Sequence, residues 1–517
     1  MTLAPTAPVR PVRDSQHRIT LWILAGVTLL RVLWLAGRPI DLYPDEAQYW
    51  IWAQHPAWGY FSKPPMVAWL IWGSIQIFGD TDLAVKLPAT LIYFLTSIVV
   101  YQIGSRLYDR RIGGWAAIAF ITLPSVSLSA VIISTDVPLL LFWALASYGL
   151  IRAREEGQAN GGWWLLTGVS IGLGLLSKYA MGFWIGSALL YLVVVAEERR
   201  HLPRYLVALA LGLLIYSPNL FWNASHGFAS YHHTAANANL HGFSLHPDAF
   251  VEFLAAQFGV FGPIFAAVLA IIAFQAWRRP GQLDRHDWFL LTLSLPTLAV
   301  MLLESALSRA QPNWSAPAYV AGTVLVVAWL SRRGRDGLVQ WSVVLHIVLA
   351  VFGFGAHDVA QALRLPLPAK FDPAHRLRGW HILGQAVSET LIQAPPLPLL
   401  ADDRELMAAL IYYMRPHPFG MLMWNPARTV NNGFEMTQSL PDRPGGDYLW
   451  ISSRPETLGV AGYFKRHEEI ARIQVPVGPG LVRDVTLTAL FGFKGYDGGA
   501  VKSLTAASAR SMPAPAP

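Results

Sequence analysis

Long apolar runs separated by short polar segments fill the first two thirds of the chain. Scanned with a window of about 19 residues, these runs lie at roughly 19–37, 82–104, 113–133, 137–151, 163–177, 180–196, 204–220, 251–276, 287–303, 314–330 and 338–356. Runs of this length and hydropathy are typical of membrane spans. The pattern therefore predicts about eleven transmembrane helices.

Two shorter apolar segments lie inside the first long loop, residues 38–81. Ala47 to Ala53 and Met66 to Phe78 are rich in Trp, Ile and Tyr, and such segments favour the boundary between lipid and water. They predict two short interfacial helices that lie in the plane of the membrane surface.

The pattern changes near residue 357, where apolar spans give way to alternating strand and helix signals. Strands are predicted at Leu397 to Ala401, Tyr448 to Ser452 and Val485 to Phe493. Asp402-Asp403 predicts an N-cap before a helix at Arg404 to Met414. These signals predict a small soluble α/β domain.

The fold class is therefore mainly α, with two parts. A cytoplasmic tail, residues 1–18, precedes a polytopic membrane domain over residues 19–356. The α/β domain follows over residues 357–498, and the tail of residues 499–517, which ends in alternating Pro and Ala, is predicted to be disordered.

Composition supports the membrane assignment. The chain is 54% hydrophobic and only 14% charged, and it contains 21 Trp, far from an average soluble domain. Its net charge of +7 comes from short basic clusters between the apolar runs rather than from one patch, which argues against nucleic-acid binding. The absence of cysteine excludes disulfides, thiol nucleophiles and Cys-based metal sites.

The basic clusters also predict the orientation of the spans. One set of alternate loops carries 17 of the Lys and Arg residues, whereas the other set carries only five, namely Arg38, Lys63, Lys86, Lys178 and Arg309. Because Lys and Arg concentrate in cytoplasmic loops, the second set faces outward. The long first loop, the Ser134-Thr135-Asp136 turn, a His-rich loop at residues 221–250 and the C-terminal domain then share the outer side.

The first outer loop carries three carboxylates beside a membrane span, Asp41, Asp45 and Glu46. Asp45 alone could be the N-cap of the interfacial helix, but a cap does not explain the group or Lys63, which follows one short helix later. Lys63 could be a snorkelling anchor. The two prolines that follow it, however, fix the direction of its ammonium group, and an ammonium group beside a carboxylate suits a lipid phosphate.

Other outer loops supply further candidates. Asp136 fits an N-cap and a functional group equally well, and Lys178 interrupts an apolar run, where a charge indicates function. Arg309 and Asn313 lie among aromatic residues that suit either sugar binding or an interfacial belt. The histidines of the His-rich loop lack carboxylate or cysteine partners at metal-ligand spacing; they are His226, His232, His233, His241 and His246.

Four segments together resemble one family of membrane enzymes. They are Tyr43-Pro-Asp-Glu-Ala-Gln-Tyr-Trp50, Gly59-Tyr-Phe-Ser-Lys-Pro-Pro-Met-Val-Ala-Trp69, Leu176-Ser-Lys-Tyr179 and Pro312-Asn-Trp-Ser-Ala-Pro-Ala-Tyr319. The chain resembles the bacterial glycosyltransferase family 39 group of the GT-C superfamily, which is related to protein O-mannosyltransferases and to the aminoarabinose transferases of lipid A. The first two segments in tandem are specific to that branch, and the later two are weaker.

The resemblance implies an inverting transferase that takes a sugar from a polyprenyl-phosphate carrier on the outer face of the bacterial inner membrane. By position, Asp45 matches the catalytic aspartate of the family, Lys63 matches the lysine that contacts the carrier phosphate, and Asp136 matches an acidic position of the second outer loop. No cofactor is firmly implied, although a divalent cation is compatible with the family. Related lipid A transferases often have Glu-Lys-Pro-Pro, whereas this chain has Ser62 before Lys63.

We therefore predict a catalytic site on the outer face. Asp45 is the predicted base with Glu46 as a supporting carboxylate, and Lys63 stabilises the departing phosphate. Lys178 and Arg309 are predicted as further phosphate contacts. The predicted substrate contacts are Tyr60, Asp136, Tyr179 and Asn313.

The expected acceptor is lipid A, lipopolysaccharide or another envelope glycolipid, and a protein acceptor is the alternative. A lipid or solute transporter, from a different class, would show internal repeats and polar residues near the membrane midplane, whereas here the polar residues crowd one face. A scaffold that only anchors the C-terminal domain would not need Asp45, Lys63 and Asp136 on the same side. The sequence leaves the sugar and the oligomeric state open.

Overall fold

A computed structural model describes residues 13–38, 40–155, 161–238, 244–363, 374–454, 458–478 and 481–498. His241, the predicted disordered tail and residues 1–12 of the predicted cytoplasmic tail lie outside these residues. The described residues form mainly helices, with one small sheet. The helices up to the middle of the chain are α1 (Arg13–Gly37), α2 (Pro44–Ala53), α3 (Met66–Phe78), α4 (Asp82–Leu107), α5 (Arg110–Thr122), α6 (Pro124–Ser129), α7 (Asp136–Ala153), α8 (Gly161–Ser177), α9 (Met181–Val194), η1 (Ala196–His201), α10 (Leu202–Ser225) and α11 (Ala229–Ala238).

The second half of the chain adds further helices and all of the strands. The helices are α12 (Pro247–Phe261), α13 (Pro263–Arg278), η2 (Pro280–Gln282), α14 (Arg285–Leu307), η3 (Pro312–Ser315), α15 (Ala318–Ser331), α16 (Asp336–Ala362), η5 (His375–Leu377), α17 (Trp380–Leu391), α18 (Arg404–Tyr413), α19 (Gly433–Thr437), α20 (Leu458–Ala461) and η6 (Tyr496–Gly498). The strands are β1 (Leu399–Ala401), β2 (Leu422–Met423), β3 (Tyr448–Ser452), β4 (Phe464–Gly478) and β5 (Leu481–Phe493).

The chain folds into two compact units. The first comprises Met1–Pro39 and Pro56–Ala356, and the second comprises Ile40–His55 and His357–Pro517. The sequence analysis placed the whole first loop with the membrane region. In the structure, the part of this loop that carries α2 instead packs with the C-terminal residues.

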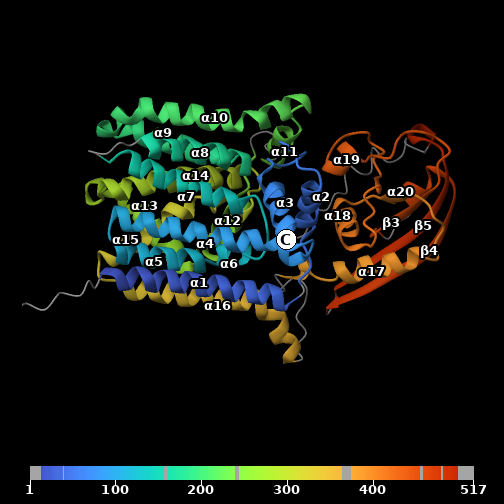
Figure 1. The fold of residues 1–517 in the computed structure, drawn as a ribbon, viewed down its shortest axis with the longest axis horizontal. Coiled ribbons are helices and arrows are strands. Elements are labelled where there is room, and N and C mark those ends of the chain that lie inside the picture. The colour runs from blue at the N-terminus through green and yellow to red at the C-terminus, as the bar shows by residue number, and fades with distance from the viewer. Residues whose placement is uncertain are drawn as a thin grey trace, which may run out of the picture. The chain divides into compact units, whose positions relative to one another are not determined.

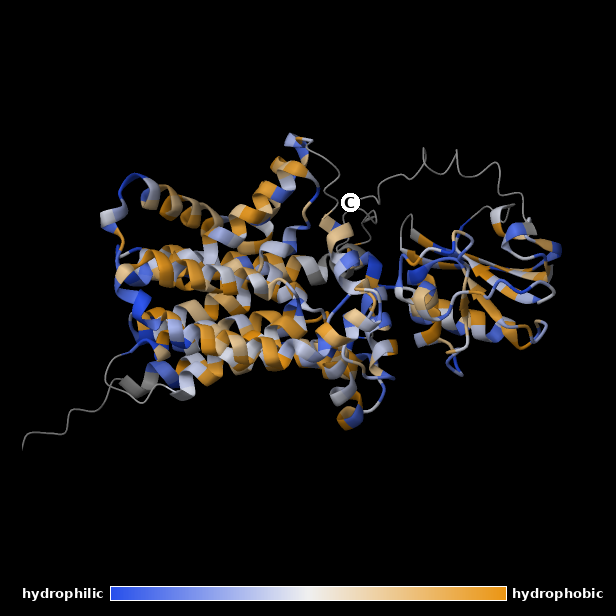
Figure 2. Ribbon diagram, turned by 90° about the horizontal axis from the view of Figure 1, so that it is seen from above, coloured by the Kyte–Doolittle hydropathy of each residue, from blue (hydrophilic) through white to orange (hydrophobic). Residues whose placement is uncertain are grey.

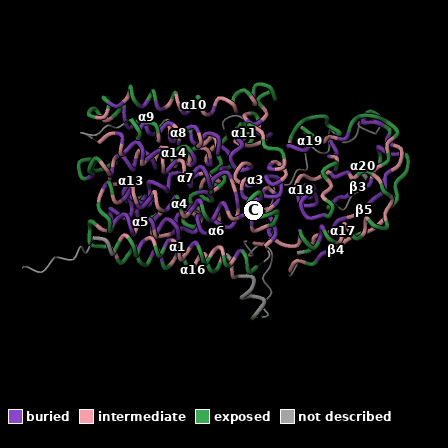
Figure 3. Tube along the Cα trace, viewed as in Figure 1, coloured by how far each residue is buried: buried purple, intermediate pink, exposed green. Residues whose placement is uncertain are grey.

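The first unit is a bundle of long apolar helices that run along its length (Figure 1). Figure 2 shows apolar residues along the flanks of these helices and hydrophilic residues gathered toward their ends. Buried residues concentrate in the middle of the bundle (Figure 3), and every residue of α15 from Ala318 to Leu330 is buried. Within the described residues, six helices are long and apolar enough to cross a membrane, and a bent pair would make a seventh. The protein is therefore a multi-pass membrane protein, while the number eleven remains a prediction.

Two of the predicted spans are broken. The run at 251–276 forms α12 and α13, which meet at an angle of 116°. Gly262 at the break has a φ of 86° and Pro263 begins the next helix, so the chain uses the two residue types that end and restart helices. The run at 113–133 likewise divides into α5 and α6 before Pro124. The predicted His-rich loop contains a helix, α11.

The arginine-rich loops meet at one end of the bundle through ion pairs. Arg154, after α7, pairs with Glu198 of η1 at 2.8 Å. Arg332, after α15, pairs with Asp287 of α14 at 2.5 Å, and the Tyr108 hydroxyl after α4 donates to the same carboxylate. These contacts connect the loops that the charge distribution assigns to one side of the membrane.

Helices α4 and α5 approach each other closely through glycine. A Cβ on Gly104 would lie 2.8 Å from the Cα of Gly113, and a Cβ on Gly113 would lie 2.6 Å from the carbonyl oxygen of Tyr101. Small residues allow such backbone contact between membrane helices, where packing rather than a hydrophobic driving force holds the helices together.

The second unit contains a five-stranded sheet in the order β2-β1-β3-β5-β4. Strand β1 pairs in parallel with β2 and β3, whereas β5 runs antiparallel to β3 and β4. The predicted strand at Tyr448 to Ser452 is confirmed as β3, and Asp403 caps α18 by accepting from the Leu406 N–H at 2.9 Å. Sequence analysis missed β4, because its side chains are mostly exposed and show no apolar alternation.

We predict that Gly113→Leu destabilises the first unit, because overpacking a close helix contact costs about 1–3 kcal/mol. The thermal unfolding midpoint of the detergent-solubilised protein should fall. Gly186→Leu, within α9 where a Cβ would meet nothing within 4 Å, is the control and should keep the wild-type midpoint. Equal midpoints for the two variants would contradict the close contact.

Candidate functional site

An ion pair and a hydrogen bond in the first unit join three elements that are distant in sequence. Asp136 is the first residue of α7, Lys178 lies in the turn between α8 and α9, and Asn313 lies in η3. The Lys178 Nζ is 2.7 Å from Asp136 Oδ1, and Asn313 Nδ2 donates to Asp136 Oδ2 at 3.1 Å. Thr135 takes the N-cap position of α7, so the Asp136 carboxylate binds these side chains rather than capping the helix.

Lys178 also lines a cavity of about 300 Å³, called the lysine cavity below. Its walls come from the Lys63 loop, the turn between α8 and α9, the start of α9, α11, the C-terminal part of α14 and η3. They provide two ammonium groups, one carboxylate, hydroxyl and amide groups, and an indole ring. The lining residues are Ser62, Lys63, Pro64, Lys178, Tyr179, Ala180, Phe183, Thr234, Asn237, Ala238, Met301, Glu304 and Trp314.

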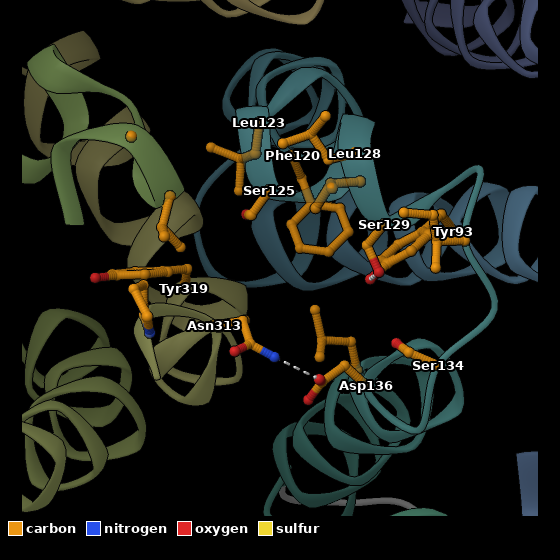
Figure 4. Close-up of a pocket in the computed structure, with 17 residues that line it drawn as sticks. Tyr93, Phe120, Leu123, Ser125, Leu128, Ser129, Ser134, Asp136, Asn313 and Tyr319 are labelled. Carbon is orange, nitrogen blue, oxygen red and sulfur yellow. Dashed lines mark hydrogen bonds between the residues drawn. The ribbon is translucent and has the colours of Figure 1, made fainter. Parts of the chain in front are cut away.

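A second cavity of about 450 Å³, the apolar cavity, is lined by Asp136 and Asn313 (Figure 4). Most of its other lining residues are apolar or aromatic, and they include Phe120, Leu123 and Tyr319. Since Lys178 lines the lysine cavity and Asp136 lines the apolar cavity, their ion pair connects the linings of the two spaces. A charged group bound on one side could thus belong to a ligand whose hydrocarbon part lies on the other.

A buried hydrogen-bond network supports the wall of the lysine cavity. The hydroxyls of Tyr179 and Ser230 are 2.6 Å apart, and Ser230 donates to Asn223 Oδ1 at 2.6 Å. Asn223 donates to Asn219 Oδ1 at 3.1 Å, and Asn219 donates to the carbonyl of Trp58 at 2.7 Å. The network therefore links the turn that carries Lys178 to the loop that leads to Lys63.

The Lys63 loop itself is tightly constrained. A Cβ on Gly59 would lie 2.5 Å from the Trp222 ring, so only glycine fits there. The Tyr60 N–H donates to the carbonyl of Lys63 at 3.1 Å, and the Tyr60 hydroxyl accepts from the Ala57 N–H at 3.1 Å. Burial raises the pKa of Tyr60 to about 12. Tyr60 is not among the residues that line the lysine cavity; it shapes the loop through these bonds.

Two of the three first-loop carboxylates, Asp45 and Glu46, lie on α2, in the second unit. Helix α2 begins at Pro44, so Asp45 lies within its first turn and is not the N-cap. Asp45 Oδ1 accepts from Arg404 Nη1 at 2.8 Å, and the Asp45 side chain is 41% exposed. Glu46 is fully buried, and its carboxylate accepts from the Tyr43 N–H at 2.9 Å, a contact that stabilises the start of the helix.

Arg309 lies apart from the lysine cavity. It is exposed and lines a polar cleft of about 420 Å³ together with His246, Asp248 and Glu252. The structure thus brings Lys63, Lys178 and Tyr179 to one cavity, places Asp136 and Asn313 at the next, and puts Arg309 elsewhere. Its predicted contact with the donor phosphate gains no support from this arrangement.

The described residues contain no cluster of three or more His, Asp or Glu side chains that could hold a metal ion. His232 and His233 lie on α11, and His246 lies at the cleft lined by Arg309.

Sequence reasoning missed three residues that the structure brings to these sites. Glu304 faces the lysine cavity from α14, and its only sequence signal was an acidic residue at the end of an apolar run. Asn219, which belongs to the buried hydrogen-bond network, showed no signal in the sequence beyond a polar residue within a span. The sequence identified Arg404 only as the start of a helix, because its partner Asp45 lies far away in sequence.

Comparisons with known proteins agree with this picture. Residues 62–222 match the model of the family described as dolichyl-phosphate-mannose-protein mannosyltransferase. The lipid A galacturonosyltransferase RgtD of Rhizobium johnstonii is 31% identical over 443 residues, which cover 84% of this chain and 91% of the relative. The lipopolysaccharide core galacturonosyltransferase RgtA of the same organism is 27% identical over 351 residues, or 63% of this chain and 68% of the relative.

The fold also has a solved counterpart. The crystal structure of ArnT from Cupriavidus metallidurans bound to undecaprenyl phosphate matches 92% of this chain and 98% of its own chain, with a TM-score of 0.64 and 16% sequence identity. The fold is therefore that of the GT-C membrane transferases. The family resemblance predicted from the sequence is confirmed, and the chain belongs to the PMT-like family of GT-C membrane glycosyltransferases that is related to the aminoarabinose transferases of lipid A.

Proposed function

We propose that the protein transfers a sugar from a polyprenyl-phosphate carrier to lipid A or lipopolysaccharide on the outer face of the bacterial inner membrane. The observation that carries the proposal is the lysine cavity, which is linked through the Lys178 and Asp136 ion pair to the lining of the apolar cavity. A polyprenyl phosphate has the same two parts, an anionic head and a hydrocarbon tail.

The charges of the lysine cavity support an anionic ligand. Lys63 and Lys178 supply two ammonium groups, and Glu304 is the single carboxylate among the lining residues. Such a concentration of positive charge at a concave surface attracts anions. The indole of Trp314 and the amide of Asn237 are groups that suit a sugar ring attached to the phosphate.

The ends of α7 support the proposed side of the membrane. Asp136 begins this helix of 18 residues, and Arg152 lies in its last turn. At 1.5 Å per residue the helix is about 27 Å long, close to the thickness of the hydrocarbon core. Asp136, the partner of Lys178, thus lies about one span length from Arg152, one of the basic residues that the positive-inside rule assigns to the cytoplasm.

The relatives favour a glycolipid acceptor and a uronic acid as the sugar. RgtD is named for transfer of galacturonic acid to lipid A, and RgtA for its transfer to the lipopolysaccharide core. A uronic acid carries a second negative charge next to the phosphodiester, which the two ammonium groups of the lysine cavity suit. The family model named for protein mannosylation keeps a protein acceptor as the alternative.

The proposed reaction inverts the anomeric carbon. An acceptor hydroxyl oxygen attacks C1 of the sugar while the bond from C1 to the phosphate oxygen breaks and leaves its electron pair on that oxygen. Asp45 receives the hydroxyl proton, and Lys63 neutralises the charge that grows on the departing polyprenyl phosphate. Lys178, Tyr179 and Glu304 contact the phosphate or the sugar.

Mass spectrometry of envelope glycolipids and glycoproteins tests the proposed function. Cells that lack the protein should lose one hexuronic acid residue from lipid A or the lipopolysaccharide core, and a plasmid copy should restore it. Unchanged glycolipids together with a lost glycoprotein modification would instead establish the protein acceptor.

We predict that Asp45→Asn lowers the transfer rate by about 10²–10⁴-fold, the contribution typical of a general base. The asparagine retains the shape of the side chain and its place in α2, so the protein should stay folded and inserted. Single-turnover transfer from a purified polyprenyl donor measures the effect. A wild-type rate in a well-folded variant would remove Asp45 from the mechanism.

Lys63→Ala should mainly weaken donor binding. Loss of a charge-assisted hydrogen bond to phosphate corresponds to an increase in the apparent KM for the polyprenyl donor of about ten- to hundredfold. Arg309→Ala removes an exposed cation from a different cleft and is the matched control, with an unchanged KM. An unaltered donor KM for Lys63→Ala would contradict the assignment of the lysine cavity.

A further inference from the structure

Hydrogen bonds to the residues just before α2, the helix that carries Asp45, connect it to the rest of the second unit. The Asp41 N–H donates to the carbonyl of Leu377 at 3.1 Å, and Asp41 Oδ2 accepts from the Trp380 N–H at 2.7 Å. The Leu42 N–H donates to the hydroxyl of Tyr413 at 2.6 Å. The C-terminal residues therefore fix the backbone just before α2.

Aromatic packing fixes the other end of α2. Trp50 is fully buried; its ring centroid lies 4.8 Å from that of Tyr412 in an edge-on arrangement, and 5.8 Å from that of Phe419 in a stacked one. Contacts of this kind bury large apolar area and favour defined ring geometries. Since both ends of the helix are held, the position of Asp45 depends on the C-terminal domain.

Arg404 is the side chain of that domain that binds Asp45 itself. It is the first residue of α18, and the Asp403 cap fixes where this helix starts. Its Nη1 donates to Asp45 Oδ1 at 2.8 Å and to Gln48 Oε1 at 2.6 Å. Asp45 and Gln48 lie one turn apart on the same face of α2, so a single guanidinium nitrogen holds both.

The charges around this contact form a small network. Arg404 also lies 3.6 Å from Glu405, and Glu405 pairs with Arg376 at 2.8 Å. The Arg376 guanidinium lies over the Tyr43 ring, 4.7 Å from its centroid. Burial opposes the charge of Arg404, but Asp45 and, to a smaller extent, Glu405 favour it, and the pKa of Arg404 lies above its ordinary value. The guanidinium therefore stays charged next to Asp45.

We propose that Arg404 is the positioning residue for Asp45: it fixes Oδ1 of the carboxylate and leaves Oδ2 directed to the acceptor hydroxyl. Within the described part of the chain, the hydrogen bond recorded at this carboxylate goes to Oδ1. The inference rests on the proposed role of Asp45 as base, and it gives the C-terminal domain a part in the reaction.

An ordinary surface ion pair is the alternative explanation. Exposed ion pairs contribute little to stability, and the Asp45 side chain is 41% exposed. The two explanations differ in what they predict for the chemical step. A surface pair can be removed without effect on the rate, whereas loss of a positioning contact misplaces the base, and a displacement of about 1 Å can cost about 10²-fold in rate.

The test uses the full-length enzyme with Arg404→Met, which keeps much of the aliphatic packing of the side chain and removes its hydrogen bonds. Single-turnover rate, donor KM, acceptor KM and the thermal unfolding midpoint are measured. We expect kcat to fall by about 10²-fold with both KM values within about twofold. Arg404→Lys, which can still donate one charged hydrogen bond, should recover part of the rate.

Two further variants make the result decisive. Arg472→Met removes another arginine–aspartate pair of the second unit, Arg472 with Asp484 on β4 and β5, and should retain the wild-type rate. In an Asp45→Asn background, Arg404→Met should cause no additional loss, because Arg404 acts through Asp45. If Arg404→Met lowers the unfolding midpoint, the rate of a well-folded Arg404→Lys decides.

The outcomes separate this inference from the proposed function. A wild-type rate for Asp45→Asn would overturn the assignment of Asp45, and with it this proposal. An inactive Asp45→Asn together with a wild-type rate for Arg404→Met, or for Arg404→Lys where that variant decides, would overturn the role of Arg404 alone. The role of Arg404 would also be overturned if Arg404→Met lowered the rate in the Asp45→Asn background by the same factor as in the wild type, because Arg404 would then act elsewhere.

Discussion

The ion pair between Lys178 and Asp136 is the interaction on which the candidate site of the first unit depends. It places opposite charges at 2.7 Å, with side chains that are only 20% and 11% exposed. Moving charged side chains out of water costs free energy unless each charge is paired and hydrogen-bonded. Asn313 supplies the additional hydrogen bond to the carboxylate. The ion pair and the Asn313 hydrogen bond therefore hold the start of α7, the turn after α8 and η3 together. These three segments contribute to the walls of the two cavities.

The same pair explains how a charged group can be available in a mostly apolar bundle. Without Asp136, the ammonium group of Lys178 would lose its ion-pair partner. With it, Lys178 has an ion-pair partner at the wall of the lysine cavity, and the proposed donor phosphate would be a second anionic partner. Lys63 reaches the same cavity from a different loop. Buried amides and hydroxyls connect the two loops by hydrogen bonds, which hold Lys63 and Lys178 in fixed relative positions.

Local sequence patterns predicted much of the fold, because charge clusters, strand signals and helix caps depend on residues that are close together in the sequence. Lys and Arg counts identified the loops that later proved to be tied together by ion pairs, such as Arg154 with Glu198. The predicted strand at β3 and the Asp403 cap are confirmed. The break at Gly262 was missed because a hydropathy window averages over a single residue. The contact of Arg404 with Asp45 joins positions 359 residues apart, and no periodicity in one sequence reports on such a pairing.

The assignment of α2 to the second unit changes how the first loop should be understood. Asp45 and Lys63 lie in the same loop, and the family motifs treat that loop as one element. Their supports are nevertheless different: Asp41, Leu42 and Trp50 anchor α2 among C-terminal residues, whereas Gly59 and Tyr60 fix the Lys63 loop within the first unit. A substitution that loosens one support need not disturb the other. The proposed base and the proposed phosphate ligand can therefore be perturbed independently, although they lie in one loop.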